Sequence, residues 1–322
     1  MKKLVARLPR LPAAVGAIVG ALVAWPASAL TITFDFTYDT SGFFSGANAA
    51  RRDVLQSAAA EYSSRLTDTL NAIVPAQGNA WTATFANPSS PAATVSLSDL
   101  AVPANTLVIY VGAANLGAGV LAQGQPGGYS ANGNSNWLNN VSARGQTGAL
   151  GLSPTDFGPW GGAISFNSAT AWHTDASPAT VEPFPGQYDL YTVALREIGH
   201  VLGLGTAPSW FTNLSGAGGV SLFGGANAVA AFGGPVPLAP GNSHWQAGTL
   251  SAALGTGNPQ AAVLNQDLAA GARSFLTALD AAALQDVGWT VVPEVSTFAW
   301  AAFIGAAGWW RWRRGRKGCV KS

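Results

Sequence analysis

The sequence predicts an α+β fold in one domain, residues 30–291, between an N-terminal and a C-terminal targeting segment. Three observations predict it: an alternating strand pattern near residue 31, two widely separated helical patterns, and Gly- and Pro-rich stretches between them. The chain has 322 residues, of which 48% are hydrophobic, so it can bury a sizeable core. No fixed-period repeat is visible, which argues against a solenoid or a propeller.

The first half of the chain contains most of the predicted strands. Residues 31–37 alternate, with Ile32, Phe34 and Phe36 on one side, as in a half-buried strand. Residues 50–70 predict a helix, because apolar residues recur three or four apart at Val54, Leu55, Ala58, Ala59, Tyr62 and Leu66. Further strands are expected at 81–85, 94–97, 106–111 and, at a sheet edge, 163–167.

The second half contains two helices with clear start signals. Asp189 is placed as the N-cap of a helix that reaches residue 202. Thr277 and Asp280 form a capping-box pattern that leads into a helix through 287, which Gly288 would stop. The stretches 112–162 and 205–240 are rich in Gly and small residues and are expected to be loops.

Charge and composition exclude several classes of protein. Four basic residues lie in the first ten positions and six in the last twelve. The part between them holds six arginines, no lysine and all 15 acidic residues, a net charge of −9. This balance excludes a nucleic-acid binder that contacts phosphates through a basic surface. With 39 Gly and 19 Pro, the chain is also neither a coiled coil nor a highly charged disordered protein.

Residues 1–29 are typical of a secretory signal peptide. A basic start is followed by an apolar stretch, 11–25, and by the small triplet Ala27-Ser28-Ala29. A membrane anchor would need about 20 apolar residues and would not explain the Ala-x-Ala ending. We therefore expect export, with signal peptidase cleaving after Ala29.

Residues 292–322 have a three-part layout. Val-Pro-Glu-Val-Ser-Thr (292–297) precedes thirteen apolar residues (298–310) and then an arginine-rich run (311–317). The layout resembles the PEP-CTERM sorting signal of Gram-negative bacteria, with Val295 in place of its second proline. This resemblance implies transient anchoring in the inner membrane, processing by an exosortase, and release to the cell surface or extracellular matrix. The alternative is a plain C-terminal transmembrane anchor.

Cysteine chemistry is excluded from the exported part. The single cysteine, Cys319, lies beyond the apolar tail, so residues 30–291 contain no thiol. The domain is therefore not a disulfide scaffold, and its stability must come from core packing, with or without a metal ion.

The strongest chemical signal is Arg196-Glu197-Ile198-Gly199-His200. Zinc peptidases carry H-E-x-x-H on a helix, because positions i and i+4 share a face and two imidazoles then hold one ion. The glutamate takes a proton from the metal-bound water. Here the first ligand position is an arginine, which has no lone pair to offer and stays protonated.

The wider pattern resembles the zincin metallopeptidases. Gly203 stands where metzincins end the helix, while Thr206 stands where they have a third histidine. Ser243-His244-Trp245 resembles the later His-Trp segment of leishmanolysin-like zincins, 263–265 lies where that group has its Met-turn, and 277–289 resembles its closing helix. The resemblance implies a zincin-like domain with a small mixed sheet, an active-site helix and a C-terminal helix.

Carried onto this chain, the resemblance makes Glu197 the catalytic base and His200 and His244 the metal ligands. Two of three expected imidazoles remain, and catalytic zinc normally has three protein ligands. Zinc binding is therefore expected to be weakened or absent. Glu197 could instead complete a two-His, one-carboxylate set.

Each residue also has a plain structural interpretation. His200 could be a buried, hydrogen-bonded helix residue, His244 a surface histidine, and Glu197 a salt-bridge partner of Arg196. His173, in Trp172-His173-Thr174, is interpreted as a structural histidine.

Three hypotheses for function follow. The first is an exported metallopeptidase-like protein with impaired or lost catalysis that still binds peptides or a partner. The second is a weakly active metalloendopeptidase that uses His200, His244 and Glu197. The third is a structural module of the extracellular matrix, whose twelve tryptophans suit contacts with extracellular polysaccharide.

Overall fold

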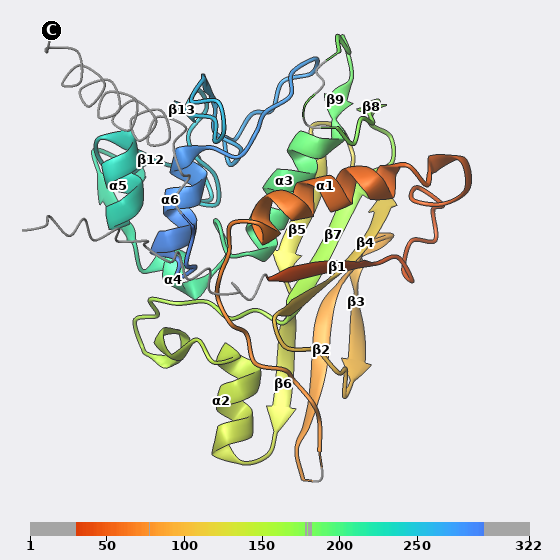
Figure 1. The fold of residues 1–322 in the computed structure, drawn as a ribbon, viewed down its shortest axis with the longest axis vertical. Coiled ribbons are helices and arrows are strands. Elements are labelled where there is room, and N and C mark those ends of the chain that lie inside the picture. The colour runs from red at the N-terminus through yellow and green to blue at the C-terminus, as the bar shows by residue number, and fades with distance from the viewer. Residues whose placement is uncertain (1–29, 77, 178, 180–181, 293–322) are drawn as a thin grey trace, which may run out of the picture.

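The computed structural model describes residues 30–292, except 77, 178 and 180–181 (Figure 1). In this part the chain has a mixed α+β fold with several small sheets and six α-helices, which confirms the predicted class. The expected signal peptide and, apart from Val292, the expected sorting tail lie outside the described residues. Within the described ranges, no helix combines the length and the apolar character needed to cross a bilayer.

A four-stranded sheet lies at the centre, in the order β1-β4-β7-β5. β1 (Thr31–Asp35), β4 (Thr106–Ala114) and β7 (Gly161–Asn167) are parallel, and β5 (Ala122–Pro126) is an antiparallel edge strand. The strand expected at 163–167 therefore exists, but its predicted edge position was wrong. β7 is paired on both sides and all its residues are buried, because the polar, Gly-containing strand β5 forms the edge instead.

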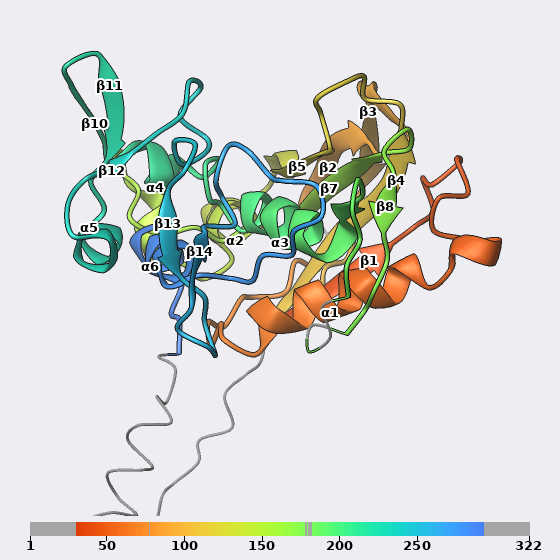
Figure 2. The same ribbon diagram turned by 90° about the horizontal axis from the view of Figure 1, so that it is seen from above.

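Helices α1 (Arg51–Ser63) and α3 (Leu190–Val201) pack together on one face of this sheet, which Figure 2 shows from above. The hydroxyl of Tyr62 on α1 donates to the backbone oxygen of Leu195 on α3 (2.8 Å). Helix α1 is shorter than predicted. Leu66 lies beyond the end of α1, where it forms an isolated bridge with Val291 and belongs to the core, so its burial does not reflect a helical face.

The stretch 112–162, which was expected to be loops, contains further elements besides β5. β6 (Gly128–Asn132) joins β2 (Ala80–Asn87) and β3 (Ser90–Ser98) in a second sheet. It is followed by α2 (Ser135–Ala143) and a short 3-10 helix, η2 (Thr147–Leu150); a further 3-10 helix, η1 (Gly46–Asn48), precedes α1. β6 is held by its backbone pairing with β2, and Asn134 caps α2 by accepting a hydrogen bond from the amide of Trp137. These contacts do not require a regular hydrophobic pattern, which is why the sequence did not predict the two elements.

Residues 172–261 include several short elements. β8 (Trp172–His173) pairs with β9 (Tyr188–Asp189) just before α3. The stretch 205–240, also expected to be loop, contains short pieces instead: α4 (Pro208–Phe211), β10 (Leu214–Ala217), β11 (Val220–Phe223), α5 (Ala226–Phe232) and β12 (Val236–Pro237). A two-stranded sheet of β13 (Leu250–Ala252) and β14 (Pro259–Ala261) follows.

The last helix, α6 (Ala278–Asp286), begins and ends as predicted. Thr277 and Asp280 form the expected capping box, each side chain accepting from the other residue's backbone amide. Gly288 follows the C-cap with a positive φ of 117°, a conformation that favours glycine at a helix end. Helix α6 packs beside α5 (Figure 1).

Candidate functional site

A pocket of about 1310 Å³ brings the sequence-predicted site residues together. Arg196, Glu197 and His200 line it from α3, and His244 lines it from the loop after β12. The edge strand β5 contributes Gln123, Gly124 and Gln125. The edge strand β5, the last two turns of α3 and the loop after β12 therefore all line the same pocket.

His200 is held in one tautomer by the end of its own helix. The amide of Gly203 donates to the carbonyl of His200 and that of Leu204 to the carbonyl of Gly199, a Schellman ending in which Gly203 has a φ of 108°. This turn places the carbonyl of Leu204 2.7 Å from Nδ1 of His200. Because a carbonyl can only accept, Nδ1 carries the proton and Nε2 holds a lone pair.

His244 faces His200 across the pocket. The Nε2 atoms of the two imidazoles are 3.0 Å apart, and their rings are nearly perpendicular. Burial, reinforced by the charge of Arg196, lowers the pKa of His244 to about 3, and burial also lowers the pKa of His200. Both rings are therefore neutral at physiological pH, as metal ligation requires.

The spacing of the two nitrogens suits a shared ion. Zn–N bonds of about 2.0–2.1 Å in a tetrahedral site place two ligand nitrogens about 3.3 Å apart. Without an ion, one Nε2–H donates to the lone pair of the other ring.

The position of His244 is fixed by its neighbour Trp245, which is fully buried. The backbone amide of Trp245 donates to the carbonyl of Leu264 (3.0 Å), and its carbonyl accepts from the amide of Gln266 (3.0 Å). Residues 263–265, where the sequence resemblance places a Met-turn, therefore support the loop that presents His244.

Arg196 stands one helical turn before His200 and lines the same pocket. One guanidinium NH donates to the carbonyl of Gln266 (3.3 Å), while its buried Nε has no hydrogen-bond partner among the described residues. Arg196 forms no ion pair with Glu197 in this part of the chain. Burial lowers the pKa of Arg196, but a guanidinium remains a cation without a lone pair.

Glu197 is buried between α3 and the edge strand β5. A Cβ added at Gly124 would lie 2.9 Å from Oε2 of Glu197 and 2.6 Å from its backbone oxygen. The glycine therefore allows β5 to approach the helix closely, and the carboxylate lies at the wall of the pocket.

The residues present do not complete a catalytic zinc site. Thr206, where the sequence resemblance would place a third histidine, donates its hydroxyl to the carbonyl of His200 (2.5 Å), a structural bond at the helix end. Glu197 does not join His200 and His244 in a three-residue ligand group within 4.8 Å in the described structure. Two neutral imidazoles are in place, and the third donor is missing.

A second group of metal-ligating side chains lies outside this pocket. One atom each of His173, Asp175 and Glu182 lies within 4.8 Å of the others, so the group could hold a metal ion. From the sequence, His173 is expected to be a structural histidine, and no pattern predicts this group. His173 and Asp175, two residues apart, were the available signal; Glu182 comes from later in the same connection between β8 and β9.

Two comparisons with known proteins were negative. No family model matches the chain, and a search of curated proteins also finds no match.

Proposed function

We propose that the protein is an exported, zincin-like metallopeptidase homologue whose catalysis is impaired or lost because Arg196 replaces the first zinc ligand. The observation that carries the proposal is the 3.0 Å approach of the His200 and His244 Nε2 atoms in a large pocket that Arg196 also lines. Two neutral imidazoles 44 residues apart in sequence meet as metal ligands do.

Arg196 opposes zinc binding, and therefore zinc-dependent peptide hydrolysis, in two ways. It removes one of three electron-pair donors, and its permanent positive charge repels a dication held by the remaining two. Without a bound ion, Glu197 has no activated water from which to take a proton. The carboxylate is present at the pocket wall, but the nucleophile that it would generate is not.

The pocket still has the features of a peptide-binding groove. β5 pairs only with β7 in the described structure, so its other edge is available to an extended segment. Gln123, Gly124 and Gln125 of this strand line the pocket. Addition of an extended peptide to an exposed strand edge uses backbone hydrogen bonds and does not require catalysis.

A weakly active metalloendopeptidase is the second candidate. The location of Glu197 in the same pocket as His200 and His244 favours it. A movement of the carboxylate towards the imidazoles would give the two-His, one-carboxylate set, but the same carboxylate would then no longer serve as the base.

The tryptophans do not strengthen the third candidate, a polysaccharide-contacting matrix module. Seven tryptophans lie between residues 30 and 292, and all are buried. They build the core, and carbohydrate contacts would need exposed aromatic faces. The proposal also includes export, exosortase processing and delivery to the cell surface or extracellular matrix. The sequence patterns of the two chain ends are the support for this part.

The proposal is tested by restoring the missing ligand with Arg196→His. Zinc binding is measured in a Glu182→Gln background, so that the second group of metal ligands does not contribute. We expect at most weak binding with Arg196 present, and one tightly bound zinc per chain with histidine. Arg196→Gln, the matched control, removes the charge without supplying a ligand and should remain weak. Tight zinc binding by the Arg196 form, or no gain with histidine, would contradict the proposal.

A further inference from the structure

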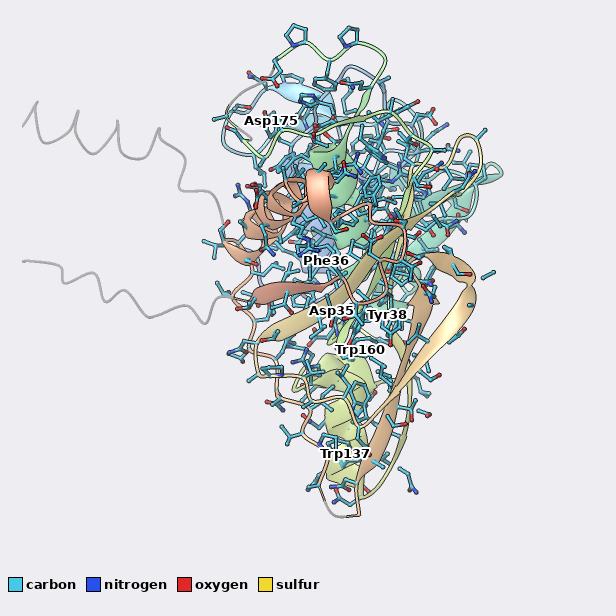
Figure 3. All side chains as sticks on the ribbon, turned by 90° about the vertical axis from the view of Figure 1, so that its right-hand side faces the viewer. Asp35, Phe36, Tyr38, Trp137, Trp160 and Asp175 are labelled. Carbon is cyan, nitrogen blue, oxygen red and sulfur yellow. The ribbon has the colours of Figure 1, made fainter. Side chains whose placement is uncertain are left out.

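We propose that His173, Asp175 and Glu182 form a structural site for a divalent transition-metal ion, with Zn²⁺ as its occupant. The site is distinct from the pocket, because none of its three residues lines that pocket. It lies at the other end of α3, where β8 pairs with β9 immediately before the helix (Figure 1). Figure 3 shows Asp175 near one end of the molecule, far from Trp137.

His173 supplies the observation that points to a ligand. The residue is 9% exposed, and its ring stacks on Phe184 with centroids 4.1 Å apart and planes nearly parallel. Its Nε2 is buried without a hydrogen-bond partner in the described residues. A buried imidazole nitrogen without a partner is costly, and a metal ion bound at Nε2 would supply the missing interaction.

The charges around the group favour a cation. Arg273 forms ion pairs with Asp175 (3.1 Å) and with Asp189 (2.9 Å), and its side chain is almost fully buried. Glu182 lies in the same ligand group as Asp175, so the three carboxylates and the one guanidinium together carry two negative charges in excess. A dication would balance this excess.

Asp175 can serve the ion without losing its present partners. Its Oδ1 accepts from the amide of Ser177 (2.9 Å) and its Oδ2 from Arg273. Each carboxylate oxygen offers more than one lone-pair direction, so an additional ligand bond is compatible with both contacts.

The donor set selects the class of metal. Ca²⁺ and Mg²⁺ prefer oxygen ligands alone, whereas one imidazole with two carboxylates suits Zn²⁺. The proposed role is to hold the connection between β8 and β9 in place. The ion would link Glu182 to His173 and, through Asp175 and Arg273, to Asp189, the N-cap of α3.

The experiment titrates Zn²⁺ into the metal-free chain that carries His200→Gln and His244→Gln, which removes both imidazoles of the pocket. We expect one zinc per chain. Glu182 is exposed, so Glu182→Gln should fold normally and weaken binding at least tenfold, whereas Asp53→Asn, at an exposed acid on α1, should change nothing. His173→Phe keeps an aromatic ring on Phe184 and should also lose the zinc.

A second readout does not depend on the pocket variants. In the chain with His200 and His244 intact, saturating Zn²⁺ should raise the melting temperature, and Glu182→Gln should reduce that rise. Absence of zinc binding in the double variant, or equal affinity with and without the Glu182 carboxylate, would overturn the proposal.

Discussion

The indole nitrogen of Trp245 donates a 3.0 Å hydrogen bond to the carboxylate of Asp280, and both residues are fully buried. The same carboxylate accepts from the amides of Val263 and Leu264 and from the hydroxyl of Thr277. Asp280, the capping-box partner of Thr277, thereby connects α6 to the two segments that place His244. The position of His244 in the pocket therefore depends on Asp280, which does not itself line the pocket.

Asp280→Asn should destabilise the fold by about 2–4 kcal/mol, because an amide cannot accept all of these bonds and leaves buried donors without partners. Urea unfolding followed by tryptophan fluorescence measures the change in the free energy of unfolding. Asp53→Asn, at an exposed position, is the control and should change it by less than about 0.5 kcal/mol. A similarly small effect of Asp280→Asn would show that this network does not support the fold.

Gly124→Ala should destabilise the protein by about 1–3 kcal/mol, because the added methyl group meets the backbone oxygen and side chain of Glu197. The same contact should push β5 away from α3 and weaken peptide binding, measured by fluorescence anisotropy of a labelled unfolded peptide. Gly234→Ala is the matched control, since its new Cβ would have no atom within 4 Å. Equal effects at the two glycines would be evidence against close packing of β5 on Glu197.

The metal-free protein should lose stability on acidification. The pKa of His244 is lowered to about 3 and that of His200 is also lowered, whereas both are near 6.5 in the unfolded chain. The unfolded state therefore binds more protons, and the free energy of unfolding falls as the pH drops from about 6.5 towards 3. Burial is the main cause for both groups, with the charge of Arg196 second for His244.

Urea unfolding at pH 7 and pH 5, with a chelator present, measures this dependence. Replacing both histidines with glutamine should flatten it. A pH slope that the double replacement leaves unchanged would place the titrating groups elsewhere in the chain.

Arg144→Met should destabilise the fold by about 3–5 kcal/mol. Arg144 is fully buried and its guanidinium donates to the carbonyls of Asn71, Pro103, Thr106 and Pro159, which would all lose their partner. Differential scanning calorimetry should show a lower melting temperature. Arg52→Met, at an exposed position on α1, provides the comparison and should have a much smaller effect.

Local signals in the sequence predicted the elements that carry the site. The N-cap Asp189, the end at Gly203 and the capping box of Thr277 and Asp280 are side-chain or glycine effects that act over a few residues, and all occur in the structure. The meeting of His200 and His244 followed from a family resemblance, because no local pattern links two residues 44 positions apart.

Other features depend on long-range contacts that the sequence does not reveal. β5 and β6 are polar and Gly-rich, so only their pairing with β7 and β2 identifies them as strands. Leu66 is bridged to Val291, more than 200 residues away, and lies in the core beyond the end of α1. Its apolar side chain therefore made the predicted helix too long. The grouping of His173 with Glu182 depends on how the chain returns between β8 and β9.

Arg196 is proposed to prevent efficient catalysis, and the decisive measurement is the rate at which the chain cleaves a fluorescently labelled unfolded protein in the presence of Zn²⁺. We expect little or no cleavage by the Arg196 form and none by Arg196→Gln. We expect at least tenfold faster, chelator-sensitive cleavage by Arg196→His, which Glu197→Gln in the same chain abolishes. Rapid chelator-sensitive cleavage by the unaltered chain, dependent on Glu197, would contradict it.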